Sequence, residues 1–107
     1  MNSLMEIERI GLPQLTEDQI IAVCKAAELA ARRIIFSRIP KRAILDLNIT
    51  VEASFEEVLT FNVDVDVALS PLCKVDVDDI VRVAVDEAFK VVDKMLREFS
   101  SNARCKA

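Results

Sequence analysis

Residues 45–69 read LDLNITVEASFEEVLTFNVDVDVAL, and this stretch decides the fold. Over 45–54 and again over 59–69, apolar side chains alternate with mostly polar ones. A period of two predicts a strand with one face buried and the other face in water. Two such runs separated by a few residues predict an antiparallel hairpin, whose strands of about ten residues each span ~34 Å.

The alternation also restricts how the two strands pair. Opposed residues share a face of the sheet, so odd-numbered apolar positions must lie opposite odd-numbered apolar positions, and the loop must hold an odd number of residues. One register sets Asp46 opposite Asp66, and like charges directly opposite each other are destabilising. A neighbouring register sets Asn48 opposite Asp66 and Thr50 opposite Asp64. We therefore predict the second register.

A long helix is expected before the hairpin. Thr16 followed three positions later by Gln19 forms a capping box, which is typical of a helix start. Pro40 disfavours helical geometry at the residue before it, so the helix is expected to end near Arg38.

A second helix is expected after the hairpin, and together these elements define the fold class. Asp76 is suited to cap a helix over about 77–99. The order helix, strand, strand, helix predicts an α+β protein, a two-layer sandwich with both helices on one face of an antiparallel sheet. A brief alternation at 5–8 suggests a short N-terminal strand as well. The 107 residues are expected to form a single domain, 1–107, with an ordered core over about 15–99 and a tail over 100–107.

The composition excludes several kinds of catalytic and binding site. The chain has no His, which removes His-based triads, imidazole bases and His-ligated zinc. A single Gly is incompatible with Walker loops and GxGxxG turns. Three Cys residues stand far apart without a CxxC motif, which argues against a structural zinc and a disulfide framework. We expect no enzyme activity, no cofactor and no metal.

Two carboxylates leave open a cation-binding site as a weaker alternative. Asp64 and Asp66 point the same way from one predicted strand, ~7 Å apart, and a hard divalent cation accepts such oxygens. We interpret them instead as part of a solvated outer face that keeps the sheet from aggregating.

Charge and hydropathy restrict the partners. A formal net charge of −4 argues against sequence-blind coating of nucleic acid or of an anionic membrane. No apolar run approaches the ~18 residues of a membrane span. The N-terminus carries acidic residues and lacks the layout of a signal peptide. A cytoplasmic protein without a membrane partner is therefore expected.

The first helix has more apolar surface than one core requires. Ala22, Leu29 and Phe36 repeat every seven residues, on nearly the opposite side from the main apolar face. A narrow sheet also has long edges that favour pairing. We therefore predict a homodimer, formed by joined hairpins or by packing of this helix against its mate, with these three residues as the partner-binding surface. The alternative is that the helix is simply well buried, or that these are scattered surface residues.

A basic cluster follows on the same helix and marks a second candidate surface. Positive charge at a helix C-terminus suits the helix dipole, so the cluster has a structural explanation. It could also bind phosphate, as in an RNA partner, or the acidic tail of a partner protein. Its members are Arg32, Arg33, Arg38, Lys41 and Arg42.

Two short motifs resemble a known family. GLPQLTE at 11–17 opens the first predicted helix, and CKVDVD at 73–78 opens the second. With the hairpin between them, they resemble a family of small uncharacterised archaeal proteins, a domain of unknown function often encoded beside the prefoldin beta subunit. The resemblance covers roughly 9–99 and carries over no catalytic residue. It implies an archaeal cytoplasmic protein with a protein partner in a chaperone, translation or RNA-processing context.

These observations favour one function and leave one alternative. The favoured function is a non-enzymatic, dimeric α/β protein that acts as an interaction or assembly module. The alternative is an RNA- or tRNA-associated accessory factor that uses the basic cluster at the end of the first helix.

Overall fold

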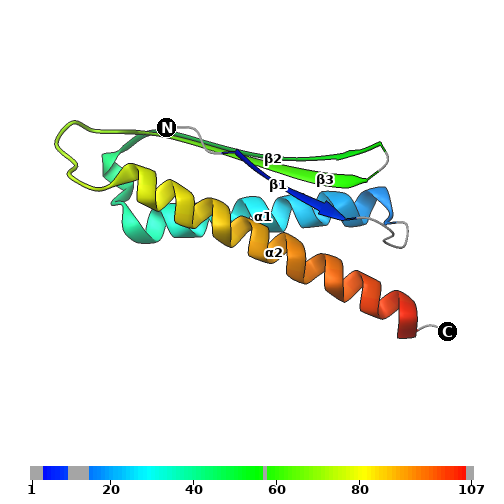
Figure 1. Ribbon diagram of the computed structural model, residues 1–107. Helices are drawn as coiled ribbons and strands as arrows, with labels where there is room; N and C mark the ends of the chain where they lie inside the picture. Colours follow the sequence, from blue (N-terminus) through cyan, green and yellow to red (C-terminus); the bar gives the residue numbers. More distant parts are fainter. Residues whose placement is uncertain (1–3, 10–14, 57, 106–107) are drawn as a thin grey trace.

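The computed structural model describes residues 4–9, 15–56 and 58–105 of the chain. Within these residues, two helices lie on one face of a three-stranded sheet, which confirms the two-layer α+β architecture (Figure 1). The elements are β1 Leu4–Arg9, α1 Glu17–Arg38, a 3-10 turn Lys41–Ala43, β2 Ile44–Phe55, β3 Leu59–Leu69 and α2 Val77–Cys105.

β3 is the central strand of the sheet, with β1 on one side and β2 on the other, both antiparallel to it. The register of β2 against β3 is the one predicted from the charges, with Asn48 opposite Asp66. Because Phe55 lies opposite Leu59, the loop between the strands has three residues, an odd number as the alternation requires. The hairpin is therefore confirmed in position and in register.

β1 confirms the short N-terminal strand and extends it from the expected 5–8 to 4–9. It pairs with residues 59–64 of β3, so it covers about half of that edge of the hairpin. The sheet consequently has β2 as its long outer strand.

The start and end of α1 confirm the sequence prediction. The Thr16 hydroxyl accepts a hydrogen bond from the Gln19 N–H at 3.1 Å, and the Gln19 side chain accepts one from the Thr16 N–H at 2.9 Å. The helix ends at Arg38, because Ile39 has extended backbone angles.

α2 starts as predicted but continues further than predicted. Asp76 Oδ1 accepts a hydrogen bond from the Asp79 N–H at 3.2 Å. The helix then runs to Cys105, past the end expected near Phe99, so a frayed tail over 100–107 is wrong as far as Cys105. That segment contains neither Pro nor Gly, the residues that most strongly end a helix, so nothing in it stops the helix.

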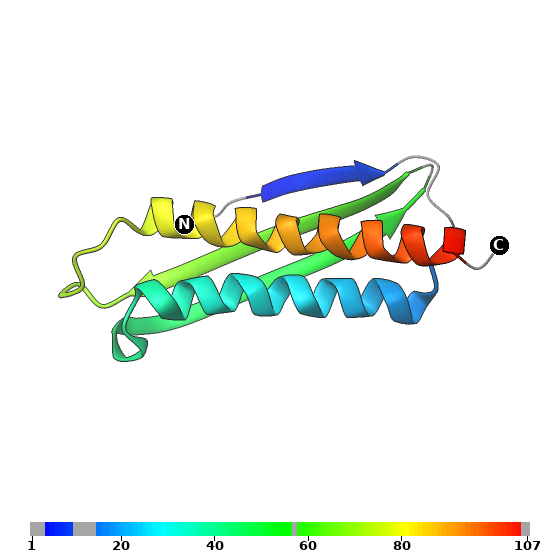
Figure 2. The same cartoon turned by 90° about the horizontal axis from the view of Figure 1, so that it is seen from below.

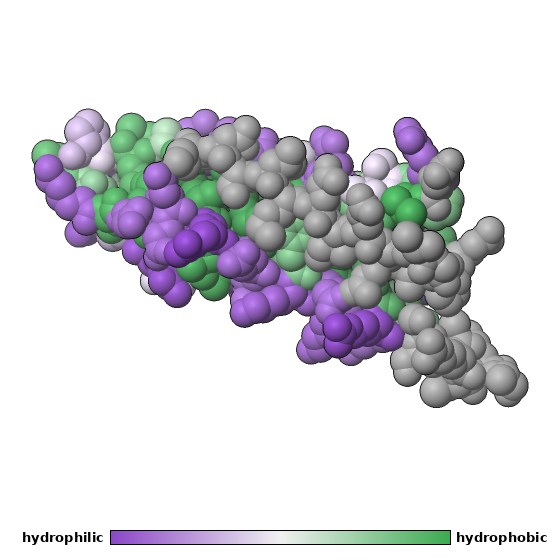
Figure 3. Space-filling view, viewed as in Figure 1, coloured by the Kyte–Doolittle hydropathy of each residue, from purple (hydrophilic) through white to green (hydrophobic). Residues whose placement is uncertain are grey.

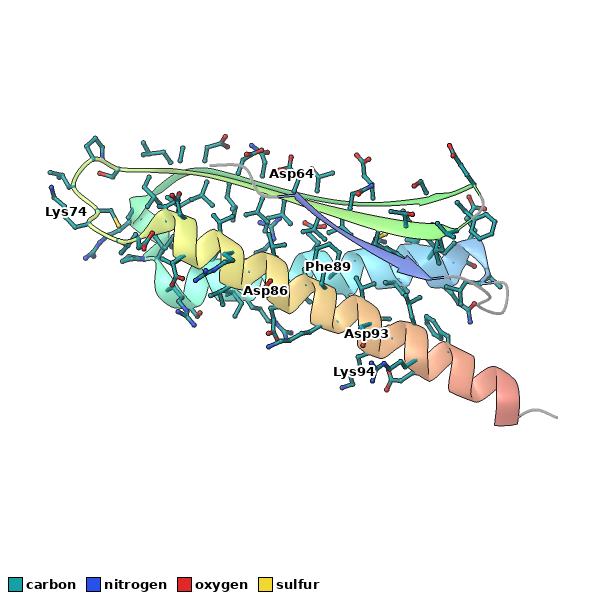
Figure 4. All side chains as sticks on the ribbon, viewed as in Figure 1. Asp64, Lys74, Asp86, Phe89, Asp93 and Lys94 are labelled. Atoms are coloured by element: carbon teal, nitrogen blue, oxygen red, sulfur yellow. The ribbon has the colours of Figure 1, made fainter. Side chains whose placement is uncertain are left out.

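The core fills the space between the sheet and the helices. The odd-numbered side chains of β3 face the helices, and Phe61, Val63 and Val65 have no exposed surface. In Figure 4, Phe89 points from α2 toward the sheet and Lys94 points away from it. The helices contribute Val23, Ala27, Ala31 and Ile35 from α1, and Ile80, Val81, Ala84, Val85, Ala88, Phe89, Val92 and Leu96 from α2.

The two layers cross obliquely. α1 packs beneath β2, whereas α2 packs beneath β3 and β1. Figure 2 shows that the strands run at an angle to the helices, so that the N-terminal half of α1 emerges from beneath the edge of β2. A strip of helix surface therefore lies beside the outer edge of the sheet.

Candidate interaction surfaces

The described residues form no metal-binding cluster and no membrane-spanning helix. No group of three or more Cys, Asp or Glu side chains among them could hold a metal ion. None of the described helices is long and apolar enough to cross a membrane. Burial raises the pKa of the Cys24 thiol, which keeps this thiol protonated and weakly nucleophilic.

The outer face of the sheet is acidic. Asp64 and Asp66 project from β3 on the side away from the helices, as Figure 4 shows for Asp64. Asp64 Oδ1 and Asn62 Oδ1 are shielded from solvent and have no hydrogen-bond partner among the side chains that the structure describes. Figure 3 shows that hydrophilic side chains also gather along α2, on the opposite side of the molecule.

The apolar line predicted on α1 is exposed along its whole length. Leu29 has 49% of its surface exposed and Phe36 has 36%, and Ala22 is also exposed. The buried residues of α1 follow a separate stripe through Val23 and Ala27. The core therefore leaves this line of side chains without contacts that would bury it.

A shallow groove lies between α1 and β2, and sequence reasoning missed it. Its volume is about 500 Å³. Ile21 lies in it with 45% of its surface exposed. Ile21 was the available signal, because it is two positions before Val23 and therefore lies about 200° around the helix axis from the buried stripe. The lining residues are Glu17, Ile20, Ile21, Cys24, Lys25, Glu28, Val51 and Ala53.

β2 forms the edge of the sheet beside this groove. It is 12 residues long, and among the described strands it pairs only with β3. A register shift between Ile44 and Asp46 interrupts the pairing at its start. Leu45 and Phe55, at the two ends of the strand, have 66% and 69% of their surfaces exposed.

The basic cluster is only partly free to meet a partner. Arg32 donates a hydrogen bond to Glu28 at 2.8 Å, and Lys41 Nζ lies 5.4 Å from the centre of the Phe36 ring. Within the described part of the chain, Arg33, Arg38 and Arg42 make no ion pair.

Helix geometry also separates the members of this cluster. Arg33 and Arg38 are five positions apart, which places them about 140° apart around the axis of α1. Lys41 and Arg42 lie beyond the helix, in the 3-10 turn. The structure therefore groups these side chains at one end of the molecule without aligning them on one face.

The two layers, the apolar core and the exposed helix and strand surfaces define a small α+β protein whose distinctive features lie at its surface. The chain belongs to the family described as "Protein of unknown function (DUF3194)", which matches residues 12–95. This confirms the resemblance to a domain of unknown function.

Relatives identified by sequence are uncharacterized archaeal proteins. One from Thermococcus kodakarensis is 32% identical over 101 residues, and the match covers 94% of each chain. Another from Pyrococcus furiosus is 29% identical over 104 residues, covering 97% of this chain and 94% of the relative.

Two solved structures have the same fold. A crystal structure from Thermococcus onnurineus superposes with a TM-score of 0.78 at 28% identity, covering 95% of this chain and 98% of that one. The solution structure of a hypothetical protein from Methanothermobacter thermautotrophicus gives a TM-score of 0.72 at 26% identity, covering 84% of this chain and 98% of that one. The fold is therefore shared across the matched length of these relatives.

Proposed function

We propose that this protein is a non-enzymatic, dimeric interaction or assembly module of the cytoplasm. The observation that carries the proposal is the apolar line on α1, where Leu29 is 49% exposed and Phe36 is 36% exposed. Large apolar side chains that gather on one surface mark sites of protein–protein contact. Ala22 lies on the same line and allows a second helix to approach closely.

Of the two dimer geometries considered, packing of α1 against its mate has more support. β1 already covers part of the β3 edge of the hairpin. Because α1 crosses beneath β2 and its N-terminal half emerges beyond the edge of the strand, joining two copies through β2 brings the two α1 helices closer than packing allows. Packed helices need about 8–10 Å. The exposed face of α1 meets no such obstacle.

The same proposal includes a partner protein other than a second copy of this chain. The resemblance implies a gene beside that of the prefoldin beta subunit, and a protein partner in a chaperone, translation or RNA-processing context. The acidic balance of the chain, with a net charge of −4, favours a protein over bare nucleic acid as that partner.

A pull-down from native extract, with and without nuclease, tests this function. Partners that survive nuclease and are lost with Leu29→Lys support an apolar docking surface on α1. Leu72→Lys is the matched control, since Leu72 is 89% exposed and lies outside both helices. Partners that disappear on nuclease treatment contradict the proposal.

A second candidate function is an RNA- or tRNA-associated accessory factor. Arg33, Arg38 and Arg42 favour it, because no described acidic side chain neutralises them. An electrophoretic shift with transfer RNA that weakens as salt rises is the expected result. Replacing these three residues with Ala should abolish the shift, whereas Arg82→Ala, at an arginine paired with Asp79, should not. A parent protein that gives no shift contradicts this function.

A further inference from the structure

The outer edge of β2 is open, and the side chains of β2 that face the helices are apolar. In the described part of the chain, β3 is its only strand neighbour, so the outward backbone groups of β2 have no strand partner. Natural edge strands are commonly protected by Pro, by Lys or by inward-pointing charges. Residues 46–55 contain neither Pro nor Lys, and the inward side chains are Leu47, Ile49, Val51 and Ala53. This edge is therefore suited to pair with another strand.

The helix layer extends beyond this edge. Because α1 lies beneath β2 and crosses it obliquely, its N-terminal half emerges beside the strand (Figure 2). The groove of about 500 Å³ marks the space above this strip of helix. Ile20, Ile21 and Cys24 line it from below, and a strand paired with β2 would lie directly above them.

We propose that the β2 edge and this groove bind an extended, basic segment of a partner protein, which joins the sheet as a fourth strand. This inference rests on the proposed function as an interaction module. It gives that function a second surface, separate from the apolar line of Ala22, Leu29 and Phe36.

The groove determines the length and the inward side chains of the bound segment. α1 lines the groove from Glu17 to Glu28, which corresponds to about 18 Å along a helix axis. An extended segment of five to six residues, at about 3.3 Å per residue, covers that length. Side chains of a strand alternate between faces, so every second residue of the segment contacts Ile21 and its neighbours. Those residues are expected to be apolar.

The outer face of the sheet determines the charge of the remaining side chains. The outward positions of β2 and β3 carry four carboxylates and no Lys or Arg. Opposite charges on neighbouring strands stabilise their pairing, and Asp46 and Glu52 lie on β2, the strand that the segment would join. Lys or Arg at every second position of the segment therefore suits this face. The four carboxylates belong to Asp46, Glu52, Asp64 and Asp66.

A second copy of the chain fits this edge poorly through its own β2. The two copies of α1, which emerge beyond the β2 edge, would then come closer than the ~8–10 Å that packed helices need. A partner segment that carries no helix beneath it avoids this clash. The geometry therefore favours a peptide strand over a self-paired sheet.

A heptapeptide of alternating Lys and Val, blocked at both ends, tests the proposal. Binding to the full chain is followed by fluorescence anisotropy and by backbone amide shifts. We expect saturable binding at micromolar to millimolar peptide, with the largest shifts and slowed amide exchange in β2. Ile21→Arg should weaken binding at least tenfold, while Leu29→Arg, a matched change outside the groove, should leave it within twofold.

Backbone methylation separates strand pairing from simple side-chain contact. Methyl groups on the nitrogens of every second residue of the peptide block one of its two edges. Methylation of one alternating set of nitrogens should abolish binding, and methylation of the other set should preserve it, because only one edge of the peptide faces β2. Replacing Lys with Glu in the peptide should weaken binding at least tenfold.

Several results would overturn the inference. One such result is no binding at millimolar peptide, and another is equal binding of the peptides methylated on either alternating set of nitrogens. Unchanged peptide binding by the Ile21→Arg variant, or equal binding of the Glu peptide and the Lys peptide, would also overturn it. Failure of this inference can be distinguished from failure of the proposed function. If Leu29→Lys removes native partners in the pull-down while Ile21→Arg removes none and the peptide does not bind, the interaction module stands and the fourth strand is wrong.

Discussion

Asp64 and Asn62 are polar residues that each have a side-chain oxygen shielded from solvent. Each of these oxygens lacks a hydrogen-bond partner in the described part of the chain. A buried polar atom without a partner costs free energy, because it has lost water without gaining a hydrogen bond. Both lie on the outer face of β3, which the alternating sequence predicts to be solvated. The pattern identifies the face correctly but cannot show how tightly neighbouring side chains cover it.

Asp64→Thr should therefore stabilise the protein. The change removes an unpaired oxygen and places Thr opposite Thr50, a favourable cross-strand pair. We expect the free energy of unfolding to rise by about 1 kcal/mol, measured by urea denaturation. Asp64→Asn is the matched control, because it keeps an oxygen at the same position, and it should give a smaller gain. A lower urea midpoint for Asp64→Thr would show that the carboxylate stabilises the fold.

Cys24 should make stability fall at alkaline pH. Burial raises the pKa of its thiol above the ordinary value of 9.0, so the folded chain keeps a proton that the unfolded chain releases. The stabilising contribution is complete below pH 9.0 and is lost as the pH rises through the folded pKa. Cys24→Ala should reduce the decline in unfolding free energy over this range, and Cys73→Ala should not. Equal declines in both variants would contradict this assignment.

At the scale of elements, local signals predict most of the fold. The capping box of α1 and the charge-based register of the hairpin need only neighbouring or opposed residues, and both are confirmed. The sequence of β1 shows only a brief alternation of apolar and polar residues. In the structure this strand is held by its pairing with β3. The groove was not predictable, because it arises from the angle at which the two layers cross. Packing of both layers determines that angle, and no single segment encodes it.

Thr16→Ala tests the contribution of the α1 cap. Thr16 and Gln19 exchange two hydrogen bonds at 3.1 and 2.9 Å, and removing the hydroxyl removes the first of them, whereas the backbone N–H that donates the second remains. The free energy of unfolding should fall by about 1 kcal/mol in urea denaturation. Thr16→Ser keeps the hydroxyl and should cost less than half as much. Equal losses in the two variants would assign the effect to the lost methyl group.

Considered as a whole, the molecule separates its buried and exposed apolar surfaces. All of its buried residues in the described part of the chain are apolar, and the core is complete without Leu29 or Phe36. The apolar line and the groove lie on neighbouring sides of α1, so one helix serves both the core and the surface. An exposed apolar stripe on a helix that already has a full core supports the association proposed above.

If two copies associate through this stripe, thermal stability should depend on protein concentration. Mass action stabilises the folded dimer by about 2.7 kcal/mol per dimer for a hundredfold rise in concentration. For a domain of this size, Tm should then rise by several degrees between micromolar and hundred-micromolar protein. Leu29→Lys should remove the dependence, because it places a charge in the contact between the helices. Leu72→Lys, at a loop residue that is 89% exposed, should preserve it. A parent protein whose Tm is constant over this range, with a mass near 12.0 kDa in sedimentation equilibrium, would contradict the dimer.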